Sequence, residues 1–294
     1  MSKTKLFIIL IFVAGAFGAG FWFKDDVLKL SESINTKVQE FQKTEVGSII
    51  SEAGKEIFTP EPLNIGGASN EVVLLKSKII EETNIQRVAN GLSKLTENEV
   101  LDKAATTKAN DMFQNQYFEH ISPTGVGPGN LVENSGYEYI VTGENLILGN
   151  FKDEVELVQD WMNSPGHRAN ILNTRYTEIG VSVVKGTYKG EAVWISVQEF
   201  GLPMSACAKP SEALKNEIEA KQENLVTLGA TIDQRKIEVE NTDKNSAYYN
   251  DLIDNYNNLV GAYNSSAREL KTIVANYNNQ VNAFNECVNA TQIE

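Results

Sequence analysis

The apolar positions in the last third of the chain repeat with a period of seven residues. From Tyr249 to Val288 they recur at alternating steps of four and three. Leu214 to Val239 follows the same pattern with two charged interruptions. Seams of this kind are typical of long helices that pack lengthwise against each other. We therefore predict two helices and the turn between them over residues 207–290.

The two seams match when these helices run antiparallel. A register that faces Leu214 with Val281 satisfies both seams, although a slip of seven residues would also satisfy them. The same register brings Cys207 beside Cys287, the only two cysteines of the chain. We therefore predict a helical (coiled-coil) hairpin with its tip near residues 245–249 and a Cys207–Cys287 disulfide at its open end. The alternative is two unpaired, buried cysteines.

Residues 71–202 carry the mixed pattern of an α+β domain. Apolar residues at helical spacing predict helices over 101–117 and 153–162, after a first helix that begins near the start of the domain. Strict alternation over 177–184 and 191–200 predicts two strands joined by a hairpin loop. A segment of this length can bury a hydrophobic core of its own.

The first 24 residues predict export. A short basic start is followed by 18 uncharged residues, 6–23, which end in Phe21-Trp22-Phe23. Such a run is either a cleaved secretory signal or an uncleaved transmembrane anchor, and the bulky aromatic end favours the anchor. In both cases the remaining chain lies outside the cytoplasm, anchored in the cell membrane or secreted if the segment is cleaved.

Residues 25–70 predict a helical stalk and a linker. Val27, Leu30 and Ile34 belong to a helical pattern over 25–58. Thr59-Pro60-Glu61-Pro62 ends this pattern, and the Gly- and Asn-rich residues 64–70 are typical of a linker.

Composition excludes several functions. The net charge is −13 and the isoelectric point is about 4.8. Nucleic-acid surfaces need clustered Lys and Arg, so we expect no nucleic-acid partner. The chain has no Cys-x-x-Cys motif, which argues against a thiolate zinc site.

The chain has only two histidines, His120 and His167, and each lies in a dense local motif. Two neutral imidazoles can bind zinc or another divalent metal, one ligand fewer than a typical catalytic zinc site provides. Glu144, between them in the sequence, could ligate the metal, orient a histidine or accept a proton. The alternatives are a structural polar network for the histidines and a buried anchor for the loop around Asn145 for the glutamate.

Ser164 allows two interpretations. With His167 and Glu144 it would form a serine-hydrolase set. Followed by Pro165, it is also a helix N-cap residue with proline in the first helical position, which we favour. No Gly-x-Ser-x-Gly or His-Glu-x-x-His motif supports the hydrolase.

Several ordered motifs together resemble a known family, the CAP superfamily of cysteine-rich secretory, antigen 5 and pathogenesis-related proteins. The resemblance is strongest to the SCP-like domains of bacterial exported proteins. It rests on Thr83-Asn84 with Arg87, Asn90-Gly91-Leu92, Tyr117–Pro123, Gly143–Leu146, Trp161–Leu172 and Trp194–Gly201.

The resemblance implies an α-β-α sandwich with a cleft lined by two histidines and acidic residues that can hold a divalent metal such as zinc. His120 and His167 match the two histidines, and Glu144 matches the acid of the Gly-Glu-Asn motif. Many animal and plant members have a second glutamate three residues after the tryptophan. Here that position is Ser164, and Asp160 lies one turn earlier.

We therefore expect a membrane-tethered, extracytoplasmic protein whose cleft at His120, Glu144, Ser164 and His167 binds a small ligand, a lipid or a divalent metal. This interpretation does not require catalysis, and the hairpin would bind a protein partner. One alternative is a metal-assisted or serine hydrolase that acts on peptides or cell-envelope polymers. Another is a non-catalytic interaction scaffold.

Overall fold

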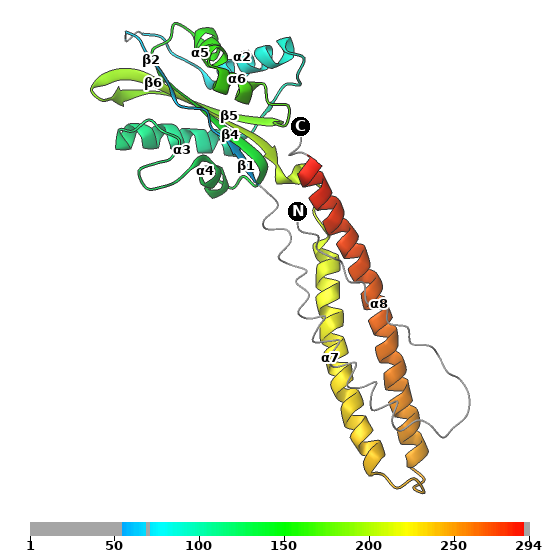
Figure 1. Ribbon diagram of the computed structural model, residues 1–294. Helices are drawn as coiled ribbons and strands as arrows, with labels where there is room; N and C mark the ends of the chain where they lie inside the picture. The colour runs from blue at the N-terminus through cyan, green and yellow to red at the C-terminus, as the bar shows by residue number, and fades with distance from the viewer. Residues whose placement is uncertain (1–54, 69–70, 291–294) are drawn as a thin grey trace, which may run out of the picture. The chain divides into compact units, whose positions relative to one another are not determined.

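The computed structural model describes residues 55–68 and 71–290, which form two compact units (Figure 1). The larger unit contains the described residues up to Leu214 and those from Ala275 onward. The helical unit contains Lys215–Val274. The predicted anchor and most of the predicted stalk lie outside the described residues. No helix within the described residues is long and apolar enough to cross a membrane.

A six-stranded sheet forms the centre of the larger unit, with its main path in the order β1-β4-β6-β5-β3. Its antiparallel core consists of β4 (Tyr139–Gly149), β6 (Glu191–Pro203) and β5 (Glu178–Tyr188). The short strand β3 (Thr96–Glu97) pairs in parallel with β5. A 3-10 turn, η1 (Met204–Ala206), follows β6.

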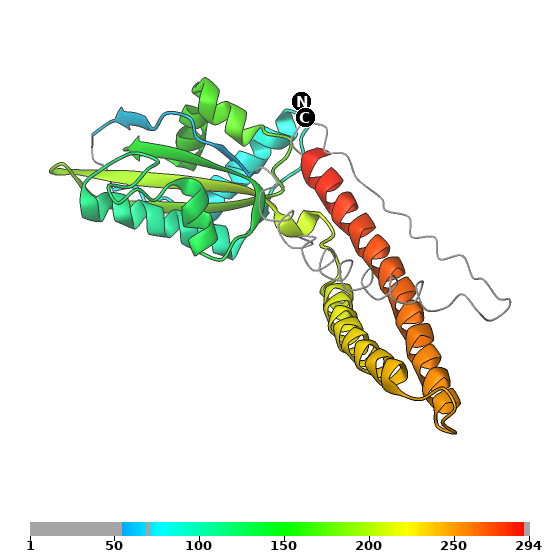
Figure 2. The ribbon, with the colours of Figure 1, turned by 60° about the horizontal axis from the view of Figure 1, so that its bottom comes forward.

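Helices cover both faces of this sheet, which confirms the predicted α+β class (Figures 1 and 2). One layer contains α2 (Lys76–Ala89), α5 (Glu154–Asn163) and α6 (Pro165–Ile171). The opposite layer contains α3 (Glu99–Asn115) and α4 (Pro128–Asn134).

Alternation along β4 divides the core between these two layers. Ile147 belongs to the same buried cluster as Trp161 and Ile171 of the first layer. Leu146 belongs to the cluster formed with Met112 of α3. Successive residues of a strand point to opposite faces, so neighbouring residues of β4 contribute to different cores.

Strand β4 was not expected from the sequence. All of its 11 residues are buried, so it lacks the polar alternation that reveals a half-exposed strand. The β5–β6 hairpin was expected, but its turn is shorter than the predicted loop. Lys189 and Gly190 make the turn with φ values of 50° and 88°, the left-handed backbone that tight hairpins require.

The N-terminal end of the larger unit differs from the prediction of a helix to residue 58 and a linker over 64–70. Strands β1 (Glu56–Phe58) and β2 (Leu63–Gly66) instead pair in parallel with β4. We call residues 56–66 the strap. Pairing with a distant strand determines its conformation, and local spacing does not report such pairing.

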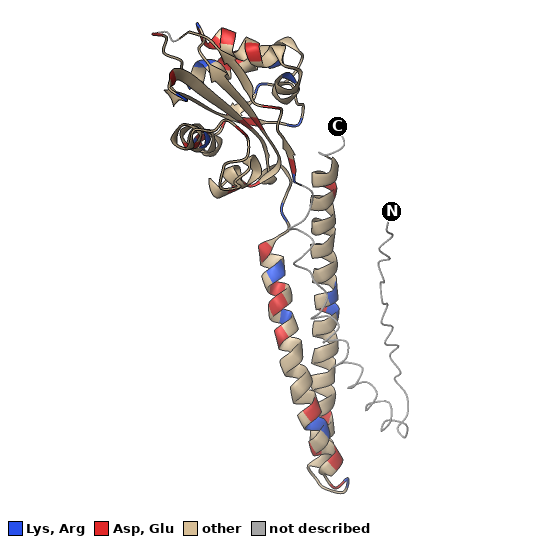
Figure 3. Ribbon diagram, turned by 60° about the vertical axis from the view of Figure 1, so that its left-hand side comes forward, with Lys and Arg blue, Asp and Glu red and all other residues tan. Residues whose placement is uncertain are grey.

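The two predicted long helices are α7 (Glu212–Asn241) and α8 (Tyr249–Ala290), joined near the predicted tip. Within the helical unit, Lys221 of α7 forms an ion pair with Glu269 of α8 at 2.8 Å, as antiparallel arms require. Charged residues are frequent along α7 and sparse along α8 (Figure 3). The buried residues of this unit are Ile218, Leu225, Gly229, Ile232, Leu252, Tyr256, Tyr263 and Leu270, and all except Gly229 and Leu252 are seam positions.

The predicted disulfide is present between Cys207 and Cys287, whose Cα atoms lie 5.8 Å apart. Both cysteines belong to the larger unit. Phe284 and Val288 of α8 are buried in the core cluster of the same unit. The end of α8 therefore belongs to the α/β core, although the sequence pattern places it in the hairpin.

Candidate functional site

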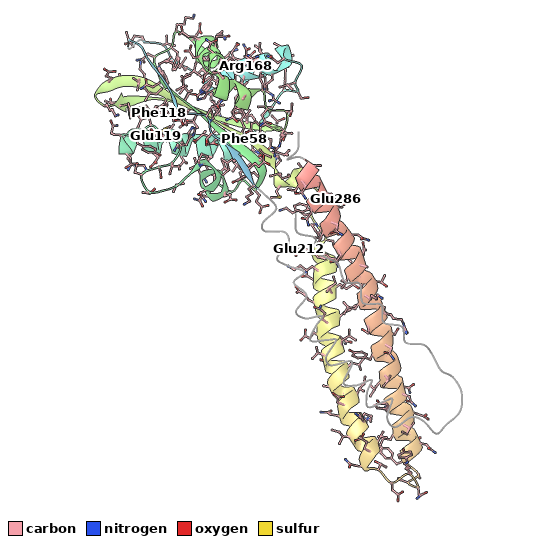
Figure 4. The ribbon with its side chains drawn as sticks, in the orientation of Figure 1. Phe58, Phe118, Glu119, Arg168, Glu212 and Glu286 are labelled. Carbon is pink, nitrogen blue, oxygen red and sulfur yellow. A yellow bond between two sulfur atoms is a disulfide. The ribbon has the colours of Figure 1, made fainter. Side chains whose placement is uncertain are left out.

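The loop that carries His120 follows α3 and is held by a buried lysine (Figure 4 labels Phe118 and Glu119 just before it). Lys108 is 3% exposed, and its Nζ donates a hydrogen bond of 2.6 Å to the His120 carbonyl oxygen. The same Nζ lies 5.0 Å from the centre of the Tyr117 ring. Burial lowers the pKa of Lys108, against the opposing influence of Glu144 and other acids. Lys108 thus fixes the loop next to acidic residues.

Both ring nitrogens of His120 have partners. Nδ1 lies 2.6 Å from Oε1 of Glu144, and Nε2 lies 2.5 Å from the carbonyl oxygen of Pro60 in the strap. A carbonyl oxygen only accepts hydrogen bonds, so Nε2 carries a hydrogen and donates it. Nδ1 therefore either donates to the Glu144 carboxylate from a doubly protonated ring or accepts from the protonated carboxyl group.

A second glutamate, which sequence reasoning missed, faces Glu144. Glu144 and Glu199 are cross-strand partners on β4 and β6, and both are fully buried. Oε2 of Glu144 and both carboxyl oxygens of Glu199 accept no hydrogen bond from another side chain or backbone N–H among the described residues. A proton on Glu199 joins the two carboxyl groups by a hydrogen bond. Burial raises the pKa of Glu199 well above its ordinary value, and repulsion by Glu144 raises it further. Burial and the neighbouring carboxyl group therefore favour the protonated, neutral form of Glu199.

His167 lies on α6 and is 1% exposed. Its Nδ1 is 2.8 Å from Oγ of Ser164, whereas its Nε2 has no hydrogen-bond partner among the described residues. Burial, followed by the charge of His120, lowers the pKa of His167 to about 4, and the Leu146 backbone acts in the opposite direction. His167 is therefore neutral near pH 7, with one nitrogen lone pair or N–H available.

Ser164 is the N-cap residue of α6 and Pro165 is the first helical residue, as the sequence predicts. The capping hydrogen bond is absent, however. The Ser164 hydroxyl bonds the His167 ring instead of a backbone N–H. Ser164 therefore orients a site residue through its side chain, which the N-cap interpretation alone did not predict.

Arg87 positions the end of α6 and is 1% exposed. Its Nη1 donates to the carbonyl oxygens of Ile171 and Asn173 at 2.7 and 2.8 Å. Lysine, a point charge on a flexible stem, could not reproduce this planar fork. The arginine of the family motif thus anchors the helix that carries His167.

Gly143 allows the close approach of α6 and the following loop to β4. A side chain at this position would lie 2.2 Å from the Tyr176 hydroxyl and 2.8 Å from Oδ1 of Asn170. The Tyr176 hydroxyl itself donates to Oδ1 of Asn170 at 3.0 Å. The glycine of the Gly-Glu-Asn motif is therefore required by packing, one residue before Glu144.

Asn145 points away from Glu144, into a satisfied amide network. Its Nδ2 donates a hydrogen bond to Oε1 of Gln198 at 3.1 Å. Its Oδ1 accepts a hydrogen bond from Nδ2 of Asn170 at 3.0 Å. Gln198 in turn donates to Oγ1 of Thr83 at 2.8 Å. These residues hold the helices of the first layer against the sheet.

The predicted site residues thus form two hydrogen-bonded pairs, His120–Glu144 and Ser164–His167. The charge of His120 acts on the pKa of His167, which links the pairs electrostatically. His120 is largely covered: its side chain is 12% exposed, and its Nε2 is bonded to the strap at Pro60. A surface pocket lies elsewhere, lined by Gly67, Ala68, Asn150, Glu191 and Ala192.

The residues fit a divalent metal only in part. Glu144 Oε2 and His167 Nε2 are buried and, apart from a proton carried by Glu199, unpartnered among the described residues, which suits ligand atoms. His120 does not fit in this conformation, because both of its ring nitrogens are engaged. Within residues 55–68 and 71–290, no three His, Cys, Asp or Glu side chains are grouped as a metal site.

Comparison with known proteins identifies the family. Residues 80–200 match the cysteine-rich secretory protein family, CAP, and the domain that they form belongs to this family. The uncharacterized protein YkwD of Bacillus subtilis is 37% identical over 169 residues, which cover 53% of this chain and 65% of YkwD. The uncharacterized membrane protein YlbC of the same organism is 34% identical over 113 residues, 38% of this chain and 32% of YlbC. The chain thus spans less than two thirds of the length of these curated relatives.

One solved structure with similarity is an extracellular protein containing an SCP domain from Bacillus anthracis. It is 32% identical, with 43% of this chain and 39% of that chain covered, and the TM-score is 0.37.

Three residues of the site were not predicted: Pro60, Lys108 and Glu199. For Glu199 a signal exists in the sequence. It follows Val193, Ile195 and Val197 in phase, so it places a carboxyl group on the apolar face of a strand. Neither Pro60 nor Lys108 has such a signal, because each contacts His120 only through tertiary structure.

Proposed function

We propose that this chain is an extracytoplasmic CAP-domain protein that binds a small polar ligand or a divalent metal ion at His120, Glu144 and His167, without catalysis. The uncharged run over residues 6–23 supports a membrane tether. The relative YlbC, described as a membrane protein, supports the same location.

The observation that carries the proposal is a pair of buried atoms without partners. Glu144 Oε2 and His167 Nε2 are both inaccessible to solvent. Among the described residues His167 Nε2 has no hydrogen-bond partner, and Glu144 Oε2 has none except a proton carried by Glu199. An unsatisfied buried polar atom costs about 1–3 kcal/mol. A bound ligand that hydrogen-bonds or coordinates these atoms would remove this cost. Buried polar atoms without partners therefore mark a candidate binding site.

Calorimetry with zinc on the full chain tests the proposal. The wild type is expected to bind zinc, and the His120→Ala/His167→Ala double variant is expected to lose binding. A Ser211→Ala variant, whose hydroxyl lies near the base of α7, serves as the matched control. Equal binding by the wild type and the double variant would remove the metal ion from the proposal.

A serine hydrolase is the second candidate, because Ser164 Oγ and His167 Nδ1 are 2.8 Å apart. A general base works best when its pKa lies near the working pH. The pKa of about 4 makes His167 a weak base at pH 7. Its Nε2 also lacks the carboxylate partner that orients the histidine of a triad. Binding is therefore the better supported function. Loss of a measured ester- or peptide-hydrolysing activity in Ser164→Ala would reverse this order.

A further inference from the structure

The strap pairs with the edge of the sheet through its main chain, as a bound peptide strand would. Glu56–Phe58 pair in parallel with Val141–Gly143, and Leu63–Gly66 pair with Ile147–Gly149. Without the strap, β4 would be an edge strand of the sheet. An exposed edge strand is a template for another extended segment, and main-chain pairing of this kind is a known mode of peptide recognition.

Residues of the candidate site also bind the main chain of the strap. Asn170 Nδ2 donates to the Phe58 carbonyl oxygen at 3.2 Å, and His120 Nε2 donates to that of Pro60 at 2.5 Å. Both donors recognise a carbonyl group, which every peptide carries. The site therefore contacts the strap in a way that does not depend on its side chains.

Arg175 adds recognition of side chains. Its Nη1 pairs with Oε2 of Glu56 at 2.6 Å, and its guanidinium lies 5.8 Å from the centre of the Phe58 ring. The Arg175 side chain is 8% exposed, and its Nε and Nη2 have no hydrogen-bond partner among the described residues. Arg175 can therefore bind an acidic residue and an aromatic residue of an extended segment, and its Nε and Nη2 can donate further hydrogen bonds.

The middle of the strap arches over the site. Four residues, 59–62, separate β1 from β2, whereas only Glu144–Leu146 separate their partners on β4. Pro60 and Pro62 have no N–H to donate, which suits this unpaired stretch. Gly166 of α6 leaves the necessary room, because a side chain there would lie 2.7 Å from Cβ of Pro60.

The strap is less buried than the strand that it covers. Ile57 is 46% exposed, and Phe58 and Ile65 are each 38% exposed, whereas every residue of β4 is buried. Exposed apolar side chains contribute little to holding the segment in place. The strap is held by main-chain bonds, the Glu56–Arg175 ion pair, the Phe58–Arg175 contact and the packing of Leu63 against the core. A competing peptide of the same sequence can reproduce all of these contacts.

We propose that the edge of β4, together with His120, Asn170 and Arg175, is a binding surface for an extended peptide, and that the strap occupies this surface in cis. This inference rests on the proposed binding function and names its ligand class: a peptide parallel to β4, with an acidic residue near Arg175 and a proline over His120. Release of the strap is then the step that opens the site.

A charge exchange tests the proposal on the full chain. Arg175→Glu repels Glu56 and releases the strap. Fluorescein-labelled peptides of residues 55–66, with Glu56 or with Glu56→Arg, are added in EDTA and followed by anisotropy. The Arg175→Glu chain is expected to bind the Arg-containing peptide at least tenfold more tightly than the native peptide. The wild type is expected to bind both poorly, because the tethered strap has a high effective concentration. Equal binding of both peptides, or of neither, by Arg175→Glu would overturn the proposal.

A second variant leaves the surface intact and changes only the strap. Leu63→Asp places a charge where the strap packs against the core, so this chain is expected to bind the native peptide. Adding Gly166→Ala should reduce that binding at least tenfold, because the new methyl group collides with the proline. Adding Gly127→Ala, where the methyl group meets open space, should leave it unchanged.

These outcomes are separate from those of zinc calorimetry. The Leu63→Asp chain could fail to bind peptide while zinc binding still depends on the histidines. That result would show that the strap is a permanent strand of the sheet and that the site binds metal. Peptide binding without zinc binding would support a peptide ligand and exclude the metal ion.

Discussion

The buried polar side chains of β4 and β6 are hydrogen-bonded differently on the two faces of the sheet. On β4 and β6 the cross-strand pairs Glu144–Glu199 and Asn145–Gln198 are immediate neighbours. The carboxyl pair faces α3, and three of its oxygens accept no hydrogen bond from another side chain or backbone N–H among the described residues. The amide pair faces α6, and its donations reach defined acceptors at 2.8–3.3 Å.

This difference separates structure from binding. Buried polar groups in a folded protein are normally satisfied, and a satisfied network makes the arrangement of its elements unique. The amide face follows that rule and holds the first helix layer in place. The carboxyl face does not follow it. Its His120–Glu144 pair meets the strap at Pro60, which also lies against α6, the helix that carries His167. We expect changes on the amide face to alter stability and changes on the carboxyl face to alter binding.

The largest effect on stability should come from Asn145→Leu. This change removes the donor to Oε1 of buried Gln198 and one of the three acceptors of Asn170 Nδ2. The unsatisfied Gln198 oxygen and the weakened network predict a loss of about 3 kcal/mol in the free energy of unfolding. Urea denaturation measures it, with exposed Asn130→Leu as the control. A loss below about 1 kcal/mol would show that the network is not structural.

A pH dependence should follow from His167. Its pKa is about 4 in the folded protein and near 6.5 in the unfolded chain. Below pH 6.5 the unfolded state therefore binds a proton that the folded state does not. Stability contributed by His167 is complete above pH 6.5 and falls as the pH decreases to 4, by about 3 kcal/mol. His167→Gln should flatten this part of the stability profile, and an unchanged profile would contradict the assignment.

A gain in stability is expected for Glu199→Gln. The raised pKa of Glu199 means that the folded protein holds a proton that the unfolded chain releases above its ordinary pKa of 4.5. This costs stability increasingly as the pH rises, and glutamine avoids that cost. We expect a gain of about 1–2 kcal/mol at pH 7.5 and almost none at pH 4. Glu191→Gln, exposed on the same strand, is the control, and a loss at pH 7.5 would refute protonation.

Glu144→Gln should have the smallest effect on stability, within about 1 kcal/mol, because an amide oxygen can still accept from His120. Its effect on binding should be larger. Loss of the negative charge predicts about a tenfold weaker affinity for zinc in calorimetry. A variant with unchanged zinc affinity would separate Glu144 from the binding site.

Sequence reasoning was most successful where the pattern is local or repeated. The seam of α8 and the Cys207–Cys287 pair follow from regular spacing. Short motifs also singled out His120 and Glu144, which are hydrogen-bonded, and their role in binding stays a prediction. It failed where pairing is distant. No local sequence pattern in the strap indicates that it pairs with β4. Strand β4 is buried on both faces, so it lacks the alternation of polar and apolar residues that identifies a strand. Glu199 was overlooked although a charge on the apolar face of β6 marks it.

Nuclear magnetic resonance of the two imidazole rings tests the central claim most directly, because a chain with only two histidines gives separable signals. We predict that the His167 ring stays neutral until the pH approaches 4, that Nε2 of His120 keeps its hydrogen, and that added zinc shifts both rings. A His167 ring that titrates near its ordinary value of 6.5, with neither ring responding to zinc, would contradict a shared binding site.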